Sequence, residues 1–359
     1  MQFTPPGHLL FLRDNTLMAQ PFDAKRLTTI GEAVPIATQI AINNSARGYF
    51  AVSETGALVL QSDAGAGQTL AMLDRAGNRV ATVGDPGQLL STSLSPEGKR
   101  ATVSVYDRSA NNYDLWIYDL MRNLRTRFSF DPANEIEGVW SPDSSQIVFN
   151  SNRIGHYDLY RKPASGAGAE ELLYADGLNK YPTSWSRDGK FVMYHSAGDA
   201  KTVSDLWVLP LEGNRRPLPF LKTQFFHEYG QFSPDGRWVA YQANESGRVE
   251  VYITPFPGPG VKSQVSVAGG FHARWRGDGK ELFYVEPNGR LMAAEIGVNG
   301  NEVAIGAVRP LFRWLLDDNG FIKYDVSADG QRFLAVMPNE QPAPEPLTLV
   351  QNWTAGLKK

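Results

Sequence analysis

Seven copies of one four-residue pattern recur along the chain, and this repeat constrains the fold more than any other feature. A typical copy reads Ser-Pro-Asp-Gly, and β-forming residues flank it on both sides. The copies begin at Ser53, Ser95, Ser141, Ser186, Ser233, Arg276 and Ser327. Their first residues lie 42 to 51 residues apart, a spacing typical of one four-stranded blade per repeat. The repeat therefore predicts an all-β chain folded as a β-propeller of four-stranded antiparallel blades.

The repeat around Ser233 shows how one blade forms. Its tetrad suits a type I turn, with Ser in the first position, Pro with its preset φ in the second, and Gly in the fourth. The turn separates two β-rich segments, 229–232 and 237–242, and further strands are expected at 249–253 and 263–267. Four antiparallel strands in this order make one propeller blade.

The number of blades depends on how the two ends of the chain are used. An eighth, degenerate tetrad begins at Thr4, so we expect about eight repeats in a single domain over residues 1–359. In that ring, the two chain ends would meet as incomplete neighbouring blades. The alternative is a six-blade ring that starts at a boundary near residue 76, with extra N-terminal blades outside it. There, residues 79–83 would supply an outer strand beside residues 347–353.

Composition indicates a folded protein without a strong charge bias. Hydrophobic residues make up 42% of the chain and charged residues 20%, with a formal net charge of −3. No basic excess favours nucleic acid, and no apolar run is long enough for a transmembrane helix. The absence of cysteine excludes disulfides and thiol catalysis. We expect a soluble monomer without direct membrane insertion, and the sequence does not determine the compartment.

The repeats resemble the TolB-type, WD-like (PD40) propeller repeats of bacteria over essentially the whole chain. Longer strings resemble the C-terminal propeller region of bacterial eukaryotic-like serine/threonine protein kinases, namely Thr16–Leu27, Asp158–Gly166, Asp205–Gly213, Val251–Gly260 and Asn352–Lys359. The resemblance implies a sensor module, extracytoplasmic if the chain derives from a membrane-anchored kinase. No kinase motif is present in this chain, so kinase activity is not implied.

The sequence contains no motif that predicts catalysis, a metal site or a cofactor. The five histidines form no H-x-H or H-E-x-x-H pattern, and the G-x-S-x-G elbow of serine hydrolases is absent. Tryptophans that precede tetrads, Trp140, Trp185 and Trp275, favour packing between adjacent blades, with a ligand-stacking surface as the alternative. We therefore expect no cofactor, no metal and no enzymatic activity.

Residues that enter the innermost strands are the candidate ligand-binding residues, because they line the mouth of the central channel. They stand four to six residues before each tetrad and differ from blade to blade, as a binding site would. They are Glu135, Glu137, Lys180, Tyr181, His227, Glu228, Tyr229, His272 and Lys323. The alternative is a channel mouth that is polar only because it is wet.

These residues predict a propeller that binds a protein, peptide or small ligand as a sensor or scaffold. The alternative function is a channel-mouth enzyme, such as a lyase, lactonase or glycan hydrolase. That alternative requires Glu135, Glu137, Glu228 and the histidines to converge on one point.

Overall fold

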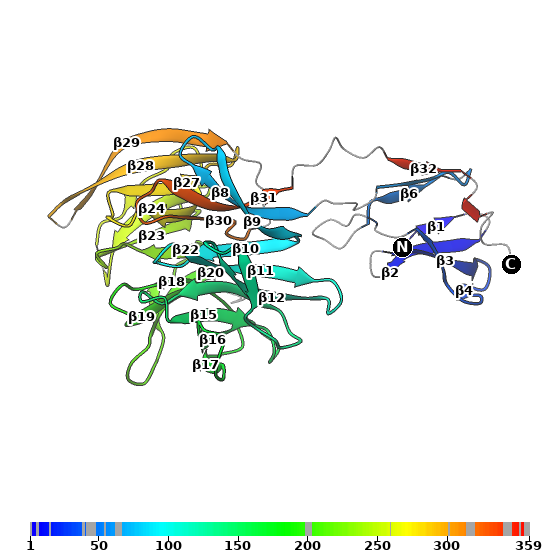
Figure 1. Ribbon diagram of the computed structural model, residues 1–359, viewed down its shortest axis with the longest axis horizontal. Helices are drawn as coiled ribbons and strands as arrows, with labels where there is room; N and C mark the ends of the chain where they lie inside the picture. Colours follow the sequence, from blue (N-terminus) through cyan, green and yellow to red (C-terminus); the bar gives the residue numbers. More distant parts are fainter. Residues whose placement is uncertain are drawn as a thin grey trace. The chain divides into compact units, whose positions relative to one another are not determined.

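The computed structural model is built almost entirely of antiparallel β-strands (Figure 1). Contacts divide the chain into two compact units, residues 67–337 and residues 1–66 with 338–359. We expected one domain over 1–359, with an alternative boundary near 76; the larger unit begins at residue 67 and ends at residue 337. Among the described residues, no helix is long and apolar enough to cross a membrane. The structure describes residues 2–4, 7–13, 16–37, 40, 48–53, 55–61, 67–197, 203–258, 260–300, 302–313, 320–339, 347–351 and 353–354.

The degenerate tetrad at Thr4 and the C-terminal string Asn352–Lys359 lie partly outside these described residues.

Five blades of the larger unit follow one another in chain order, each a four-stranded antiparallel meander from the inside outward. Blade 1 contains β10 (Leu89–Leu94), β11 (Arg100–Asp107), β12 (Asn112–Asp119) and β13 (Leu124–Arg127). Blade 2 contains β14 (Glu135–Trp140), β15 (Gln146–Ser151), β16 (Asp158–Pro163) and β17 (Glu171–Tyr174). Blade 3 contains β18 (Asn179–Trp185), β19 (Phe191–Ala197), β20 (Ser204–Pro210) and β21 (Leu218–Leu221). Blade 4 contains β22 (His227–Phe232), β23 (Trp238–Ala243), β24 (Glu250–Pro255) and β25 (Ser263–Gln264). Blade 5 contains β26 (Phe271–Trp275), β27 (Glu281–Val285), β28 (Arg290–Asn299) and β29 (Glu302–Arg313).

The sixth blade joins the two ends of this unit and closes the ring. Its inner strands come from the C-terminal side, and its outer strands come from the N-terminal side. In order they are β30 (Tyr324–Val326), β31 (Arg332–Pro338), β8 (Gln68–Asp74) and β9 (Arg79–Gly87). Each innermost strand contacts the next around the ring, and β30 contacts both β26 and β10. The predicted propeller is confirmed, as a closed ring of six blades.

The blade number and the closing strands differ from the eight-repeat expectation. The segment 79–83 lies in β9 and is an outer strand, as the six-blade alternative expected. Its neighbour is β8, however, and not 347–353: β32 (Thr348–Val350) pairs with β7 (Leu58–Leu60) in the smaller unit. The reason is that β8 presents its own apolar residues to the ring, with Leu70 and Leu73 fully buried. The closed ring then leaves no blade face bare.

The smaller unit contains the repeats that begin at Thr4 and Ser53. One sheet is formed by β1 (Gln2–Thr4), β2 (His8–Arg13), β3 (Thr16–Asp23), β4 (Thr28–Thr29) and β5 (Val34–Ala37), with β5 pairing with β3. The other sheet has the order β32-β7-β6, where β6 is Phe50–Val52. A shared apolar cluster that includes Leu10, Leu17, Leu58 and Trp353 joins the two sheets.

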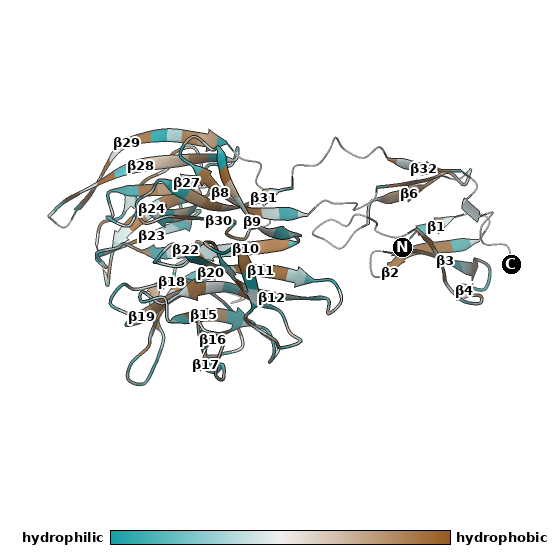
Figure 2. Ribbon diagram, viewed as in Figure 1, coloured by the Kyte–Doolittle hydropathy of each residue, from teal (hydrophilic) through white to brown (hydrophobic). Residues whose placement is uncertain are grey.

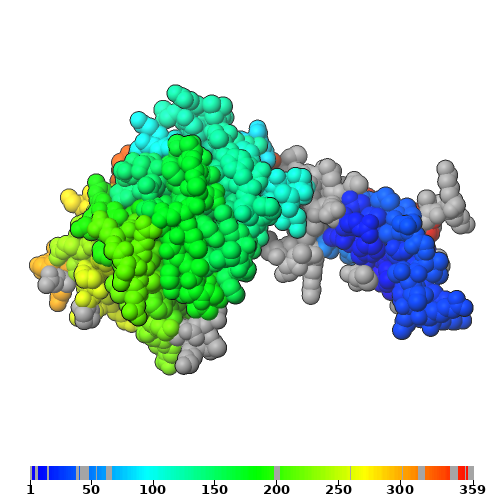
Figure 3. Space-filling model, turned by 90° about the horizontal axis from the view of Figure 1, so that it is seen from below, coloured from blue at the N-terminus to red at the C-terminus, as the bar shows by residue number. Residues whose placement is uncertain are grey.

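Six apolar clusters hold the ring together, one between each pair of neighbouring blades. Figure 2 shows hydrophobic residues along the strands of the ring, and in Figure 3 the residues of blades 2 to 4, coloured from green to yellow-green, lie side by side on one surface. The clusters are represented, in ring order, by Leu115 with Phe149, Leu159 with Tyr194, Met193 with Tyr241, Val251 with Leu282, Leu291 with Phe333, and Leu334 with Val103. Burial of such side chains contributes about 1.5–3 kcal/mol each, so every blade depends on its neighbours.

The tetrads form the predicted turns between the first and second strands of each blade. In blade 4, the Gly236 amide donates to the Ser233 carbonyl at 2.9 Å, and the Ser233 hydroxyl bonds the Asp235 carboxylate at 2.5 Å. The fourth residue takes a left-handed conformation, with φ of +72° at Gly236. Glycine suits this position because it carries no Cβ. The inner strands thus all end at one side of the ring, where six tetrads surround the axis.

Candidate functional site

The innermost strands carry β-bulges that re-aim individual side chains. The strand register shifts between the first and second strands of blades 1 to 5. Three bulge residues, Glu137, Tyr229 and His272, have positive φ values of 53°, 52° and 56°. Each stands four residues before its tetrad. Such backbone strain in non-glycine residues is uncommon and clusters at functional sites, so these positions are the first candidates.

The structure brings aromatic side chains of three blades together in the ring interior. Tyr181 stacks on His195 at a centroid distance of 5.0 Å. His195 contacts Tyr229 at 4.8 Å, and Tyr229 contacts His272 at 4.7 Å. After burial, the nearby charge of Glu137 contributes to the raised pKa of Tyr181 and of Tyr229, so we call these four residues and Glu137 the central cluster. Four of its five members were predicted from the sequence.

His195 is the member that sequence reasoning missed. It lies on β19, the second strand of blade 3, where the repeat pattern predicts packing between blades.

Burial dominates the electrostatics of the central cluster. It raises the pKa of Glu137 to about 8, assisted by the nearby Glu228 charge and opposed by Arg274. Neither carboxyl oxygen of Glu137 has a hydrogen-bond partner among the described residues. Burial also lowers the pKa of His195 and of His272 to about 3. Near neutral pH, the cluster is therefore an enclosed, largely uncharged group of rings around a protonated carboxyl.

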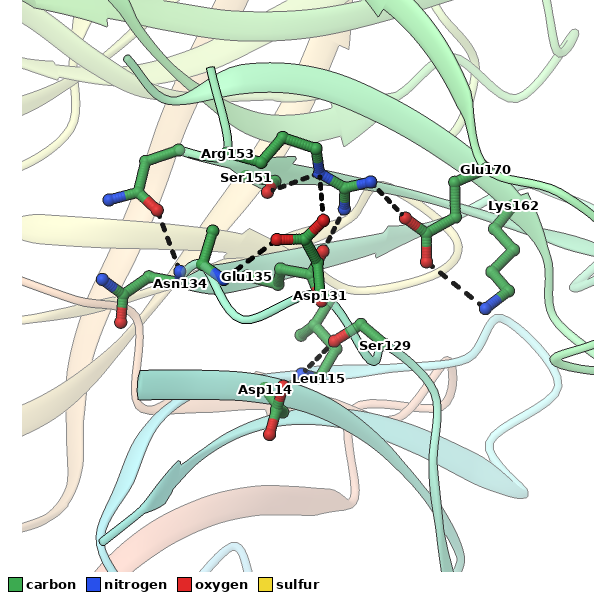
Figure 4. Close-up of polar contacts among 12 residues, drawn as sticks. Asp114, Leu115, Ser129, Asp131, Asn134, Glu135, Ser151, Arg153, Lys162 and Glu170 are labelled. Carbon is green, nitrogen blue, oxygen red and sulfur yellow. Dashed lines mark hydrogen bonds and ion pairs between the residues drawn. The ribbon is translucent and has the colours of Figure 1, made fainter. Parts of the chain in front are cut away.

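Glu135, in contrast, belongs to an ion-pair network that anchors blade 2 (Figure 4). Its carboxylate pairs with Arg153, which also contacts Glu170 at 2.7 Å. Glu170 in turn contacts Lys162 at 3.3 Å. Burial raises the pKa of Glu135 to about 7. Because the carboxylate already has a protein partner, Glu135 is a structural residue in this conformation.

Lys180 and His227 are likewise held by protein partners. The Lys180 ammonium is fully buried between Asp158, at 2.9 Å, and Asp176. His227 Nε2 contacts Glu245 at 3.1 Å, and burial lowers the pKa of this histidine to about 4. Within the described part of the chain, neither these two side chains nor Glu135 makes a hydrogen bond, ion pair or ring contact with the central cluster.

The remaining two predicted residues differ in position. Glu228 is half-buried and close enough to Glu137 to raise its pKa, and it accepts a hydrogen bond from Gln242 at 3.4 Å. Lys323 is buried just before β30.

A cavity lies at the end of the ring where the tetrads meet. It was not identified from the sequence. We call it the tetrad cavity, and its volume is about 1040 Å³. Tetrad residues from all six blades line it, including Glu97, Asp143, Arg187, Pro234, Asp278 and Asp329. Gln231, Arg274 and Asp325, each two residues before a tetrad, also line it.

Three tryptophans also line the tetrad cavity. Trp140 Nε1 donates to the Ser93 carbonyl of blade 1 at 3.2 Å, and Trp275 Nε1 donates to the Gln231 carbonyl of blade 4 at 3.1 Å. These bonds between adjacent blades agree with the packing interpretation. Trp185 instead bonds within its own blade and, like Trp275, is only half-buried. Tryptophan side chains therefore contribute to blade packing, and the half-buried indoles of Trp185 and Trp275 also leave part of their surface open at the cavity.

Arg274 gives the cavity a buried hydrogen-bond donor. The residue is 7% exposed. Its Nε contacts Asp325 Oδ1 at 3.2 Å, and its Nη1 donates to the Ala273 carbonyl at 3.0 Å. Its Nη2 makes no hydrogen bond with any described residue. A guanidinium offers five N–H donors, so Arg274 retains donors for an acceptor that enters the cavity.

Within the described ranges, no group of three or more His, Cys, Asp or Glu residues is arranged to hold a metal ion.

Comparison with known proteins finds a family match in part of the ring. Residues 68–206 match the family model of the TolB beta propeller domain, PD40. A curated relative, the Tol-Pal system protein TolB of Helicobacter pylori, is 25% identical over 164 residues, which cover 45% of this chain and 36% of the relative. The chain thus matches little more than a third of the length of that relative.

Solved structures share the fold. A structure assigned as TolB from Agrobacterium tumefaciens superposes with a TM-score of 0.62 at 16% identity, covering 77% of this chain and 99% of its own. An oligogalacturonate lyase from Vibrio parahaemolyticus gives a TM-score of 0.51 at 12% identity, covering 85% of this chain and 82% of its own. At these identities the likeness shows the propeller fold alone. The resemblance to kinase propeller regions stays a prediction.

Proposed function

We propose that this chain, which carries a TolB-type β-propeller of PD40 repeats, is a binding module that holds a segment of a partner protein in the tetrad cavity. The observation that carries the proposal is the composition of that cavity. All six blades contribute to it, half-buried tryptophans line it, and Arg274 supplies a buried donor. Tryptophan and arginine are the residues most enriched where binding energy concentrates in protein interfaces.

The size of the cavity favours a peptide segment over a small molecule. Pockets for small molecules measure roughly 300–1,000 Å³ and enclose most of the ligand surface. The tetrad cavity, at about 1040 Å³, is at the upper limit of that range, and exposed tetrad residues such as Pro96 and Asp143 form its border. A chain segment that crosses this border would contact several blades at once.

A sensor role is the finer part of the proposal. Its support is the resemblance of strings such as Asp158–Gly166 and Asp205–Gly213 to kinase propeller regions. These strings include β16 and β20, the third strands of their blades, so they build the scaffold rather than the cavity. The binding role does not depend on them.

A channel enzyme is the second candidate, because Glu137 has the raised pKa that a general acid needs. Neutral His195 and His272 lie in the same cluster. Against this candidate, Glu137 is 7% exposed and both its carboxyl oxygens are enclosed. The binding role is therefore the better supported of the two.

Selection of short random peptides on the purified protein tests the binding role. Affinities are then compared with two variants. Trp185→Leu removes a cavity wall whose indole bonds only its own blade, and we expect it to weaken the selected peptides about tenfold. Glu228→Gln changes one of the channel-mouth residues predicted from the sequence and keeps the shape of the side chain. Because Glu228 does not line the tetrad cavity, we expect little effect on peptide affinity. Failure to select any binder, or a loss confined to Glu228→Gln, would overturn the assignment to the tetrad cavity.

A further inference from the structure

We infer that the occupant of the tetrad cavity is a basic peptide segment, with an Arg or Lys side chain against Trp185 or Trp275 and the tetrad carboxylates. This inference rests on the proposed function and specifies the chemistry of the partner.

The first observation is the charge of the cavity lining. Five acidic residues line the tetrad cavity: Glu97, Asp143, Asp278, Asp325 and Asp329. Only two basic residues, Arg187 and Arg274, line it as well, so the formal charge of the lining is 2 − 5 = −3. Three of the five carboxylates already pair with arginines: Glu97 with Arg100, Asp278 with Arg276, and Asp325 with Arg274. Asp143 and Asp329 make no ion pair with any described residue, so these two carry the negative charge that attracts a cationic segment.

The tetrad geometry favours the ionised form of three of these carboxylates, Asp143, Asp278 and Asp329. A hydrogen bond from the Ser141 hydroxyl, 2.6 Å long, is the main cause that lowers the pKa of Asp143. The equivalent Ser327 hydroxyl lowers the pKa of Asp329. Arg276 lowers the pKa of Asp278 to about 2. Arg276 compensates the charge of Asp278, whereas the serine hydroxyls leave Asp143 and Asp329 as negative charges at the cavity.

The second observation is that most tryptophans of the ring already have a cation over the indole, and it does not depend on the charge of the cavity lining. Cations already lie over other tryptophans of the ring, at 4.8 to 5.7 Å from the ring centroids: Arg100 over Trp140, Arg125 over Trp116, Lys222 over Trp207 and Arg237 over Trp238. In the larger unit as described, Trp185 and Trp275 lack such a cation. Both are half-buried, and both line the tetrad cavity. An incoming guanidinium or ammonium would give them the partner that the other four have.

Arg274 indicates that the cation arrives on a peptide and stays near the rim. Its charge disfavours a second cation deep in the cavity, while its Nη2 group can donate to a main-chain carbonyl. A peptide can hold its basic side chain away from Arg274 and offer a main-chain carbonyl to Arg274 Nη2. A lone inorganic cation offers no such acceptor.

The test uses matched tetrad variants and the peptides selected on the wild-type protein. The double variant Asp143→Asn, Asp329→Asn removes two cavity charges, and asparagine keeps an oxygen that accepts the serine hydroxyl bond. Asp188→Asn is the control, because Asp188 makes the same 2.6 Å bond to Ser186 but does not line the cavity. We expect the double variant to lose about tenfold in affinity and the control to change less than about twofold.

The outcomes separate this inference from the proposed function. Selected peptides should be enriched in Arg and Lys, and their affinity should fall with added salt, because exposed charges are screened. If peptides bind and depend on Trp185 but lack basic residues, or if the double variant binds them normally, the inference fails while the binding role stands. An equal loss with Asp188→Asn would also overturn it, because damage to the turns would then explain the effect. If no peptide binds the wild-type protein, both fail.

Discussion

The fourth residue of each tetrad provides a matched test of the turn that defines the repeat. Ser144 and Gly236 occupy this position in blades 2 and 4, with φ of +60° and +72°. In both, the amide donates to the first residue of the tetrad at 2.9 Å. A Cβ at Gly236 would meet no atom within 4 Å, so a substitution there changes only the backbone energy. Exchanging the two residue types therefore isolates the cost of a side chain in the left-handed conformation.

The magnitude follows from two opposing terms. A side chain in this conformation costs roughly 1–2 kcal/mol, whereas glycine loses about 0.4–1 kcal/mol through its greater freedom in the unfolded chain. We therefore expect Gly236→Ser to lower the free energy of unfolding by about 0.5–1 kcal/mol and Ser144→Gly to raise it by a similar amount. Urea unfolding followed by tryptophan fluorescence measures both. The double variant should lie near the wild-type protein, since the sites are on different blades. Stabilisation by Gly236→Ser, or destabilisation by Ser144→Gly, would refute the reasoning.

Two further predictions concern buried charged groups. The pKa of Glu137 is raised from its ordinary value of 4.5 to about 8, so its contribution to stability is fully present below pH 4.5 and is lost as the pH rises through 8. We expect Glu137→Gln to remove this decline in melting temperature between pH 5 and 8, and parallel curves for variant and wild type would contradict the pKa. Lys180→Met leaves Asp158 buried without its cation and should lower the free energy of unfolding by about 3–5 kcal/mol. Chemical denaturation measures this loss, and a value below about 1 kcal/mol would show that the pair does not stabilise the blade.

The sequence predicted the blades because their determinants are local. Each tetrad forms its own turn through bonds within a few residues, as the Ser233 hydroxyl does with Asp235. The ring closure is different, because β31 pairs with β8, which is far away in the chain. Nothing local distinguishes the third strand of the last blade at 68–74 from the apolar segment at 347–353. The eight-repeat expectation failed for this reason.

The candidate site was predictable where position in the repeat decides the direction of a side chain. Glu137, Tyr229 and His272 share one place before their tetrads, and the bulges bring them toward the ring interior. Lys180 lies on an equivalent strand, but its partner Asp158 comes from a different strand, β16. Such ion pairs depend on tertiary contacts that spacing does not reveal. The tetrad cavity was missed because residues from six blades form it, and each appears in the sequence as an ordinary turn or packing residue.

The indole N–H signals of the tryptophans give the most direct measurement of the central claim. A selected basic peptide is titrated into the ¹⁵N-labelled protein, and each signal is followed. We expect the Trp185 and Trp275 signals to shift saturably with one shared Kd, while those of Trp116 and Trp207, which do not line the tetrad cavity, stay unchanged. Binding that shifts Trp116 or Trp207 and leaves Trp185 and Trp275 in place would contradict binding in the tetrad cavity.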